Sequence, residues 1–233
     1  MTYAITPVSN ATPYDPFAPE NILIGLVDAI NHRPDHPLAD LTPVKGAGVY
    51  LIYYLGIHQS FDAYESLTKP NQDELRVPIY VGKAVPKGAR KGQRRKTVEE
   101  DEAAASLATR LNNHRVSIEH ADNLDVRDFQ YRYLPVKAFW IPTMERLLIE
   151  HYAPLWNQVV DGFGNKAQGS ERGTTAPSPW DTIHPGRLKN LNKRKKRRLS
   201  RDQVVALINH ALARSSAPME AETAITTEIM SSE

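Results

Sequence analysis

The chain has 233 residues, which suits one large domain or one domain with extra segments at its ends. It contains no cysteine, which excludes disulfides, thiolate metal sites and a cysteine nucleophile. No apolar run is long enough for a transmembrane helix, and the first twenty residues lack the pattern of a secretory signal. We therefore expect a soluble, cytoplasmic protein.

The net charge of +2 conceals two basic segments. Residues 83–96 hold seven basic residues and residues 187–201 hold nine, and neither segment contains an acidic residue. In the rest of the chain, acidic residues outnumber basic ones by 14. Clustered Lys and Arg are typical of a surface that binds nucleic acid, although a solvated loop or a nuclear localisation segment has the same composition.

The first half of the chain predicts one helix and two strands. Residues 20–31 place apolar side chains on one helical stripe, after an irregular arm and before a proline-rich linker that ends at residue 45. Gly48–Tyr54 is typical of a buried strand, and Val77–Val81 predicts a second, with Pro78 at its start or on a sheet edge. The residues between these strands are too many for a hairpin loop, so we expect them to carry some structure of their own.

The second half predicts helices around one more strand. The expected elements are a helix (102–120), a strand (128–136), a helix (142–152), a Gly/Ser-rich loop (162–175) and a last helix (200–214). Ser200 and Gln203 have the spacing of a capping box at the start of the last helix. This order predicts an α+β fold with a small, mainly antiparallel three-stranded sheet flanked by helices, with added N- and C-terminal helices.

Several polar residues stand where a core favours apolar ones. Tyr50 and Tyr80 lie in the first two strands, so both phenols reach one face if these strands pair. Arg110 and His114 are four residues apart and share a helix face. Glu145 lies in the first turn of a later helix.

Asn157 follows the predicted helix that contains Glu145. Each of these residues also has an ordinary structural interpretation. The tyrosines suit packing, the Arg–His pair suits a solvated surface, Glu145 suits the helix dipole and Asn157 suits a turn. Their order and combination point to a shared site.

The tripeptides Gly48-Val49-Tyr50 and Tyr80-Val81-Gly82 resemble the two signatures of the GIY-YIG nucleases. The Arg, Glu and Asn that follow in that family resemble Arg110, Glu145 and Asn157, in the same order. Val replaces Ile in both tripeptides, and a long insertion separates them.

A closer resemblance is to the type II restriction endonucleases of this fold, over roughly residues 46–187. The strings GAGVYLIYYLG, PIYVGKAVP, PLWNQVVDGFGN and WDTIHPGR are similar to that branch, and so is His114 placed four residues after the Arg. The implied organisation is an N-terminal arm and helix (1–45), a catalytic domain (46–187), a basic segment with a C-terminal helix (188–214) and a disordered tail (215–233).

The resemblance and the chemistry of phosphodiester hydrolysis imply the same roles. Glu145 would hold one divalent ion, Mg²⁺ with Mn²⁺ as a substitute, and Arg110 would neutralise charge on the phosphate. Tyr50 would be the general base if its pKa were lowered, whereas His114 would be an alternative base or would take the proton onward.

Three further residues would assist this chemistry. Tyr80 and Lys83 would position the phosphate or the water, and Asn157 would orient the substrate or its neighbours.

The expected substrate is double-stranded DNA. Residues of the first basic segment would contact phosphates or bases: Lys87, Arg90, Lys91, Arg94, Arg95 and Lys96. Among them Arg90, Arg94 and Arg95 are candidates for reading guanine. We interpret the second basic segment as a non-specific phosphate clamp. The resemblance implies a homodimer on a palindrome of G and C, with dimer contacts from the N-terminal helix or helix 200–214, and with no organic cofactor and no membrane.

Other functions fit parts of the pattern. A repair or homing nuclease with the same catalytic module is one alternative, although such enzymes carry further domains for which 233 residues leave little room. A DNA-binding protein without catalysis, or an RNA-binding protein, is another. The intact set of candidate residues argues against these two.

Overall fold

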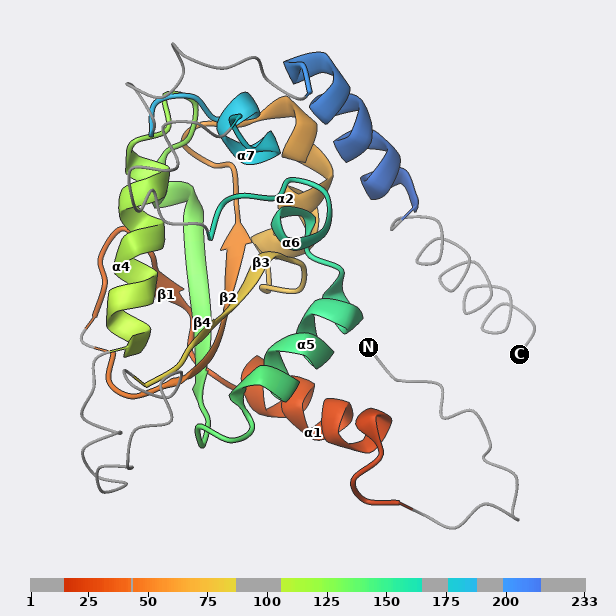
Figure 1. Ribbon diagram of the computed structural model, residues 1–233. Coiled ribbons are helices and arrows are strands. Elements are labelled where there is room, and N and C mark those ends of the chain that lie inside the picture. Colours follow the sequence, from red (N-terminus) through yellow and green to blue (C-terminus); the bar gives the residue numbers. More distant parts are fainter. Residues whose placement is uncertain (1–14, 43, 87–105, 165–175, 188–198, 215–233) are drawn as a thin grey trace, which may run out of the picture.

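The computed structural model describes residues 15–42, 44–86, 106–164, 176–187 and 199–214 (Figure 1). Most of the predicted N-terminal arm and all of the predicted C-terminal tail lie outside these ranges. Within them, no helix combines the length and apolar character needed to cross a membrane.

The described residues form a four-stranded antiparallel sheet with the order β1-β4-β2-β3. Its strands are β1 (His36–Pro37), β2 (Gly48–Tyr54), β3 (Pro78–Ala84) and β4 (Phe129–Pro135). The α+β class is confirmed, but the prediction of three strands is wrong. Two residues of the predicted linker pair with β4, His36 opposite Tyr131, and add a short edge strand.

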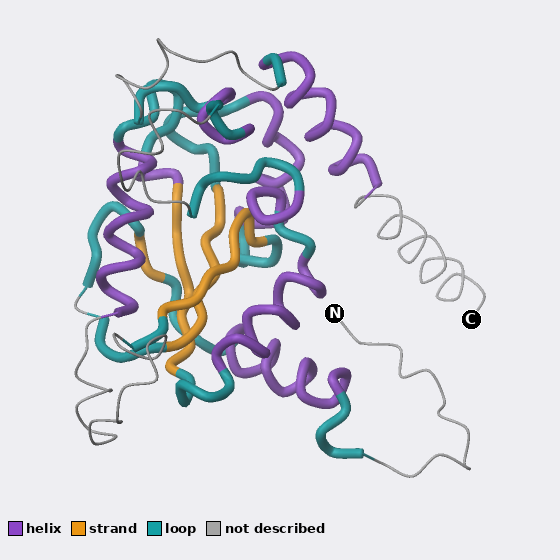
Figure 2. The backbone as a smooth tube through the Cα atoms, viewed as in Figure 1, coloured by secondary structure: helices purple, strands orange, loops and turns teal. Residues whose placement is uncertain are grey.

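β2 is buried along its whole length because strands flank it on both sides and helices cover both faces (Figure 2). Its alternate side chains therefore enter two separate cores. Tyr50, Ile52 and Tyr54 belong to the first core. The intervening side chains of β2 belong to the second core.

The helices divide between the two faces of the sheet (Figures 1 and 2). They are α1 (Pro19–Asn31), α2 (Glu65–Gln72), α4 (Ser106–Glu119), α5 (Ile141–Tyr152), α6 (Leu155–Gln158) and α7 (Pro179–Ile183), with 3₁₀ turns η1 (Asp62–Tyr64) and η2 (Val126–Asp128). Side chains of α4, α6 and α7 pack in the first core, whereas those of α1 and α5 pack in the second. As predicted, the segment between β2 and β3 has structure of its own, η1 and α2.

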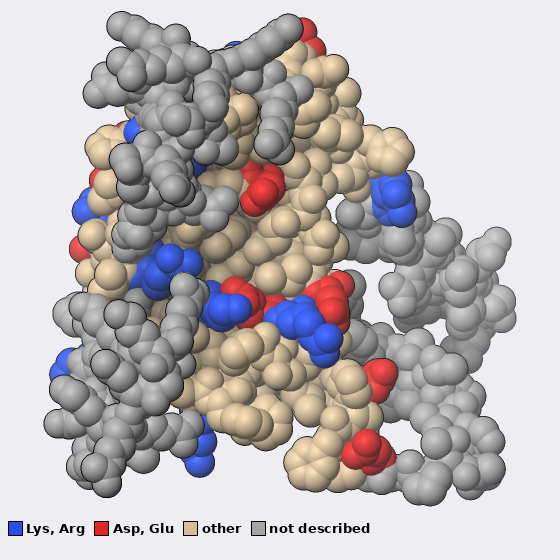
Figure 3. Space-filling model, in the orientation of Figure 1, with Lys and Arg blue, Asp and Glu red and all other residues tan. Residues whose placement is uncertain are grey.

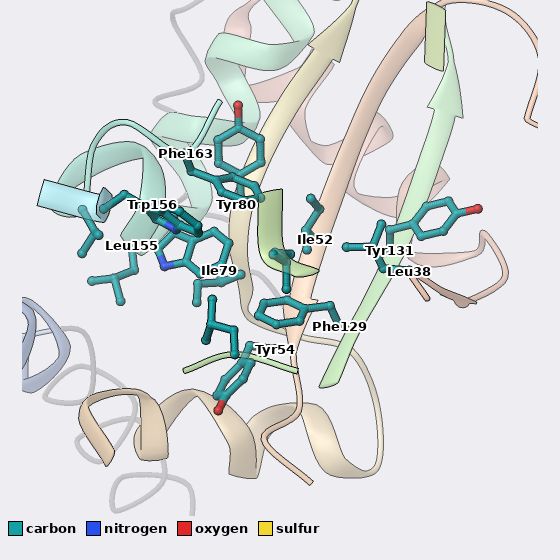
Figure 4. Close-up of a cluster of buried hydrophobic side chains, with 14 of the residues drawn as sticks. Leu38, Ile52, Tyr54, Ile79, Tyr80, Phe129, Tyr131, Leu155, Trp156 and Phe163 are labelled. Atoms are coloured by element: carbon teal, nitrogen blue, oxygen red, sulfur yellow. The ribbon is translucent and has the colours of Figure 1, made fainter. Parts of the chain in front are cut away.

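A last helix spans residues 201–214 and confirms the predicted capping box. The Ser200 amide donates to Gln203 Oε1 at 2.8 Å, and the Gln203 amide donates to Ser200 Oγ at 3.2 Å. Val204 and Ile208 of this helix join the first core, whose aromatic centre is drawn in Figure 4. That core supports the residues of the candidate site.

Candidate active site

The strand register brings the two signature tyrosines to one face of the sheet. Tyr50 pairs with Gly82, and Ile52 pairs with Tyr80, so both phenols point into the first core with ring centroids 6.3 Å apart. Gly82 is needed for this arrangement, because a Cβ at this position would collide with the Tyr50 phenol. The predicted pairing of β2 with β3 is confirmed, and the register that the insertion left open is now defined.

α4 brings His114 against both phenols. His114 Nε2 lies 2.7 Å from Tyr50 Oη, and the imidazole centroid lies 5.0 Å from that of Tyr80. Arg110 lies one turn earlier on the same helix, and its charge and a hydrogen bond act on Tyr50. The four-residue spacing of Arg110 and His114 thus places both on one face of α4, beside Tyr50.

Burial sets the protonation of these groups. It raises the pKa of Tyr50 well above its usual value and raises the pKa of Tyr80 to about 12. Burial first, and then the positive charges of Arg110 and Arg187, lower the pKa of His114 to about 3. The lowered pKa expected for a tyrosine base is therefore not found, because burial outweighs the nearby Arg110. The pair consists of a neutral phenol and a neutral imidazole.

Glu145 lies on α5, which packs against the edge strand β3 from the second-core side of the sheet. It is the fifth residue of α5, so its predicted place in the first turn is wrong by about one residue. Its carboxylate forms an ion pair with Lys83 of β3 and raises the pKa of both signature tyrosines by its charge. Lys83 is thus brought to the site, with Glu145 as its contact.

One carboxylate suits a hard cation that keeps most of its water and takes further oxygen ligands from a phosphate. Among the described residues no group of three or more His, Cys, Asp or Glu side chains is placed to hold a metal. A single carboxylate such as that of Glu145 is a ligand that a hard divalent cation accepts.

Asn157 contacts the protein backbone and not the tyrosine side chains. Its Oδ1 accepts from the Val81 amide at 2.8 Å, and its Nδ2 donates to the Val81 carbonyl at 2.9 Å. Since β3 is the edge strand, this side chain takes the place of a neighbouring strand at the residue between Tyr80 and Gly82. Its amide oxygen and nitrogen are both used in this way.

The predicted DNA-contacting residues lie outside the described ranges: Lys87, Arg90, Lys91, Arg94, Arg95 and Lys96. On the face drawn in Figure 3, basic and acidic side chains lie side by side in a band across the middle. Positive charge on the described part of that face is therefore largely balanced by its neighbours.

Sequence reasoning predicted a glycine-rich loop from residue 162 but not its contacts with His114 and Tyr80. Phe163 packs against His114, with ring centroids 4.6 Å apart and an angle of 23° between the rings. A side chain at Gly164 would collide with Tyr80 Oη. Arg187 binds the backbone of this turn and Asp181, so its prediction as part of a phosphate clamp is wrong. The run Gly-Phe-Gly at 162–164 was the available signal.

Comparison with known families agrees with this geometry. Residues 42–212, well over half of the chain, match the model of the Eco29kI GIY-YIG domain. No curated protein matches the chain. The matched range contains both tyrosines, the Arg–His pair, Glu145 and Asn157. GIY-YIG nucleases generally depend on a divalent metal. The chain therefore belongs to the Eco29kI GIY-YIG family, in the restriction branch of the GIY-YIG endonucleases.

Proposed function

We propose that this protein is a type II restriction endonuclease that hydrolyses phosphodiester bonds within a short palindromic duplex site of G and C. The observation that carries the proposal is the 2.7 Å hydrogen bond between Tyr50 Oη and His114 Nε2, with Arg110 one turn away on α4 and Glu145 at the neighbouring sheet edge. Membership of the restriction branch supports the substrate class. Two-fold symmetric DNA calls for a homodimer that cuts both strands.

The Tyr50–His114 pair acts as a proton relay. Because Tyr50 is a neutral phenol and His114 a neutral imidazole, the phenol donates its proton to Nε2 as its oxygen takes a proton from the attacking water. The water oxygen then bonds to phosphorus, and the opposite P–O bond breaks. The leaving oxygen departs on the other strand end and takes a proton from solvent, to which His114 returns the proton that it received. The Arg110 guanidinium stabilises the charge that develops on the phosphate oxygens.

Glu145 holds the metal ion, for which we propose Mg²⁺ with Mn²⁺ as a substitute. A bound ion of this type acts as a Lewis acid on the phosphate and the leaving oxygen. Lys83, which forms an ion pair with Glu145, and Tyr80, whose ring lies 6.3 Å from that of Tyr50, would position the phosphate or the water. We assign Asn157 to positioning β3, in accord with its two hydrogen bonds to Val81. The predicted phosphate contacts of residues 87–96 belong to the same proposal.

The first test is cleavage of plasmid DNA with Mg²⁺, followed by sequencing of the ends. We expect discrete fragments with one palindromic end sequence and two protomers bound to each site. A smear of products indicates a non-specific nuclease, and binding without cleavage indicates a silent DNA-binding protein. A monomer on cognate DNA, measured by sedimentation, contradicts the homodimer.

Three variants test the assignment of roles. Glu145→Gln is expected to abolish cleavage while DNA affinity stays within a few-fold of the wild type. Tyr50→Phe and His114→Ala are expected to reduce kcat by about 100-fold or more, since each breaks the relay. If Tyr50→Phe keeps near-wild-type turnover across the pH–rate profile, the tyrosine does not carry the proton.

A further inference from the structure

Arg187 begins the second basic segment, yet its side chain is only 10% exposed. Its Nε and Nη2 donate to Asp181 Oδ1 at 3.0 and 2.8 Å. Nη1 donates to the Phe163 carbonyl at 2.9 Å, and Nη2 donates to the Gly162 carbonyl at 3.1 Å. The guanidinium also lies 4.4 Å from the centroid of the Trp180 ring. All three of its nitrogens are thus bonded within the protein.

The turn that Arg187 binds places the Phe163 ring against His114 and Tyr80. The Phe163 ring stacks on His114, with centroids 4.6 Å apart, and forms a T-shaped contact with Tyr80, with centroids 5.0 Å apart. Trp156 supports Phe163 from behind at 4.4 Å (Figure 4). Gly164 leaves room for the Tyr80 hydroxyl. The turn therefore meets both His114 and Tyr80.

We infer that Arg187 is a positioning residue for the Tyr50–His114 pair, acting through the turn at residues 162–164. The inference rests on the proposed function, in which that pair moves the proton. By fixing two successive carbonyls, Arg187 fixes the Phe163 ring, which keeps the imidazole from rotating away from Tyr50. Proton transfer between Tyr50 Oη and His114 Nε2 requires this alignment, since hydrogen bonds weaken steeply when bent.

A test of this inference must separate the effect of the Arg187 charge on His114 from the effect of Arg187 on the position of the turn. The groups that face His114 are Tyr50 from β2, Tyr80 from β3, Arg110 from α4 itself, and Arg187 from the segment after α7. Arg187→Lys keeps the positive charge but loses the planar fork that binds Asp181 and the two carbonyls. Phe163→Leu keeps every charge and removes only the stacked ring. The two variants therefore test position with the charge unchanged.

The opposite face of the sheet offers a matched control. Arg132 of β4 is likewise buried, donates to Asp35 at 2.5 Å and to the Leu75 carbonyl at 3.1 Å, and lies 5.7 Å over the Tyr53 ring. Tyr53 belongs to the second core, away from His114. Arg132→Lys thus measures the effect of loosening a buried arginine clamp that does not touch the catalytic pair.

The experiment measures kcat and KM for DNA cleavage between pH 5.5 and 9. It also follows the titration of the His114 ring in the free protein by NMR. We expect Arg187→Lys and Phe163→Leu to lower kcat by about 10- to 100-fold with KM within twofold. We also expect the pKa of His114 to rise by about one pH unit or more in both, because water reaches the ring. Arg132→Lys should lower Tm and leave kcat and the His114 pKa unchanged.

Two results would overturn the inference. One is wild-type kcat and an unchanged His114 resonance in Phe163→Leu, which decides the matter even if Arg187→Lys does not fold. The other is an equal loss of kcat in Arg132→Lys, which indicates a general loss of stability. Wild-type turnover in His114→Ala is a different failure. That result removes the proposed relay, while the NMR measurement still shows whether Arg187 fixes the orientation of the His114 imidazole.

Discussion

A single missing side chain at Gly82 makes room for the Tyr50 phenol. Gly82→Ala places a methyl group against the phenol ring, which is fully buried. The phenol must then shift away from His114 Nε2, and a displacement of about 1 Å in a catalytic group costs about 100-fold in rate. We expect kcat to fall by about that factor, with DNA affinity retained, in steady-state cleavage assays.

Gly25 provides the matched control for Gly82→Ala. It lies inside α1, and a Cβ there would meet no atom within 4 Å. Gly25→Ala should leave kcat unchanged and stabilise the fold by about 0.5–1 kcal/mol, because alanine loses less backbone entropy in a helix. Full activity in Gly82→Ala would show that Tyr50 need not stay where the sheet places it.

At the scale of elements, Asn157 joins α6 to the edge strand β3. Asn157→Ala removes both hydrogen bonds to Val81 and leaves its buried amide and carbonyl unpaired, at a cost of about 1–3 kcal/mol in free energy of unfolding. Asn157→Asp keeps the acceptor but sets a carboxylate oxygen against the Val81 carbonyl, so we expect at least the same loss. Urea denaturation and hydrogen exchange of the Val81 amide measure both effects.

The outcome at Asn157 separates two roles. If it binds DNA or the phosphate, both variants lose activity without losing stability, and exchange at Val81 stays slow. Asn112→Ala is the control, because that side chain lies exposed on α4 and accepts hydrogen bonds from Arg115. It should change neither quantity.

Elements whose pattern is local were predictable from the sequence. β2 was placed at Gly48–Tyr54 because both of its faces are apolar, and the last helix was located by its Ser200–Gln203 cap. β1 was missed, since two residues with a proline form a strand only through their partner β4. A strand that forms only through a partner far along the chain leaves no signal in its own residues.

The candidate site divides in the same way. The tripeptides and the four-residue spacing on α4 predicted the face that holds Tyr50 and His114. Two sets of hydrogen bonds were not predictable: those between Asn157 and Val81, and those from Arg187 to the turn at residues 162–164. Each joins a side chain to the backbone of another element. The direction of the Tyr50 pKa was also missed, since burial depends on the whole fold.

At the scale of the whole molecule, two buried histidines make stability depend on pH. His114 and His184 are both buried, and burial lowers the pKa of each to about 3. Arg201 and Arg187 contribute at His184, whose Nε2 lies 2.7 Å from Tyr64 Oη. The folded protein keeps both rings neutral in the range where the unfolded chain, with a histidine pKa of about 6.5, binds protons.

Stability should therefore rise with pH between about 3 and 6.5, because the unfolded chain binds more protons there. Each histidine contributes a slope of up to about 1.4 kcal/mol per pH unit, or about 2 kcal/mol lost between pH 6.5 and pH 5. Urea denaturation from pH 5 to 7.5 measures the slope. His184→Gln should lower it by one histidine's share. An unchanged slope in His184→Gln would mean that this imidazole does not stay neutral when buried.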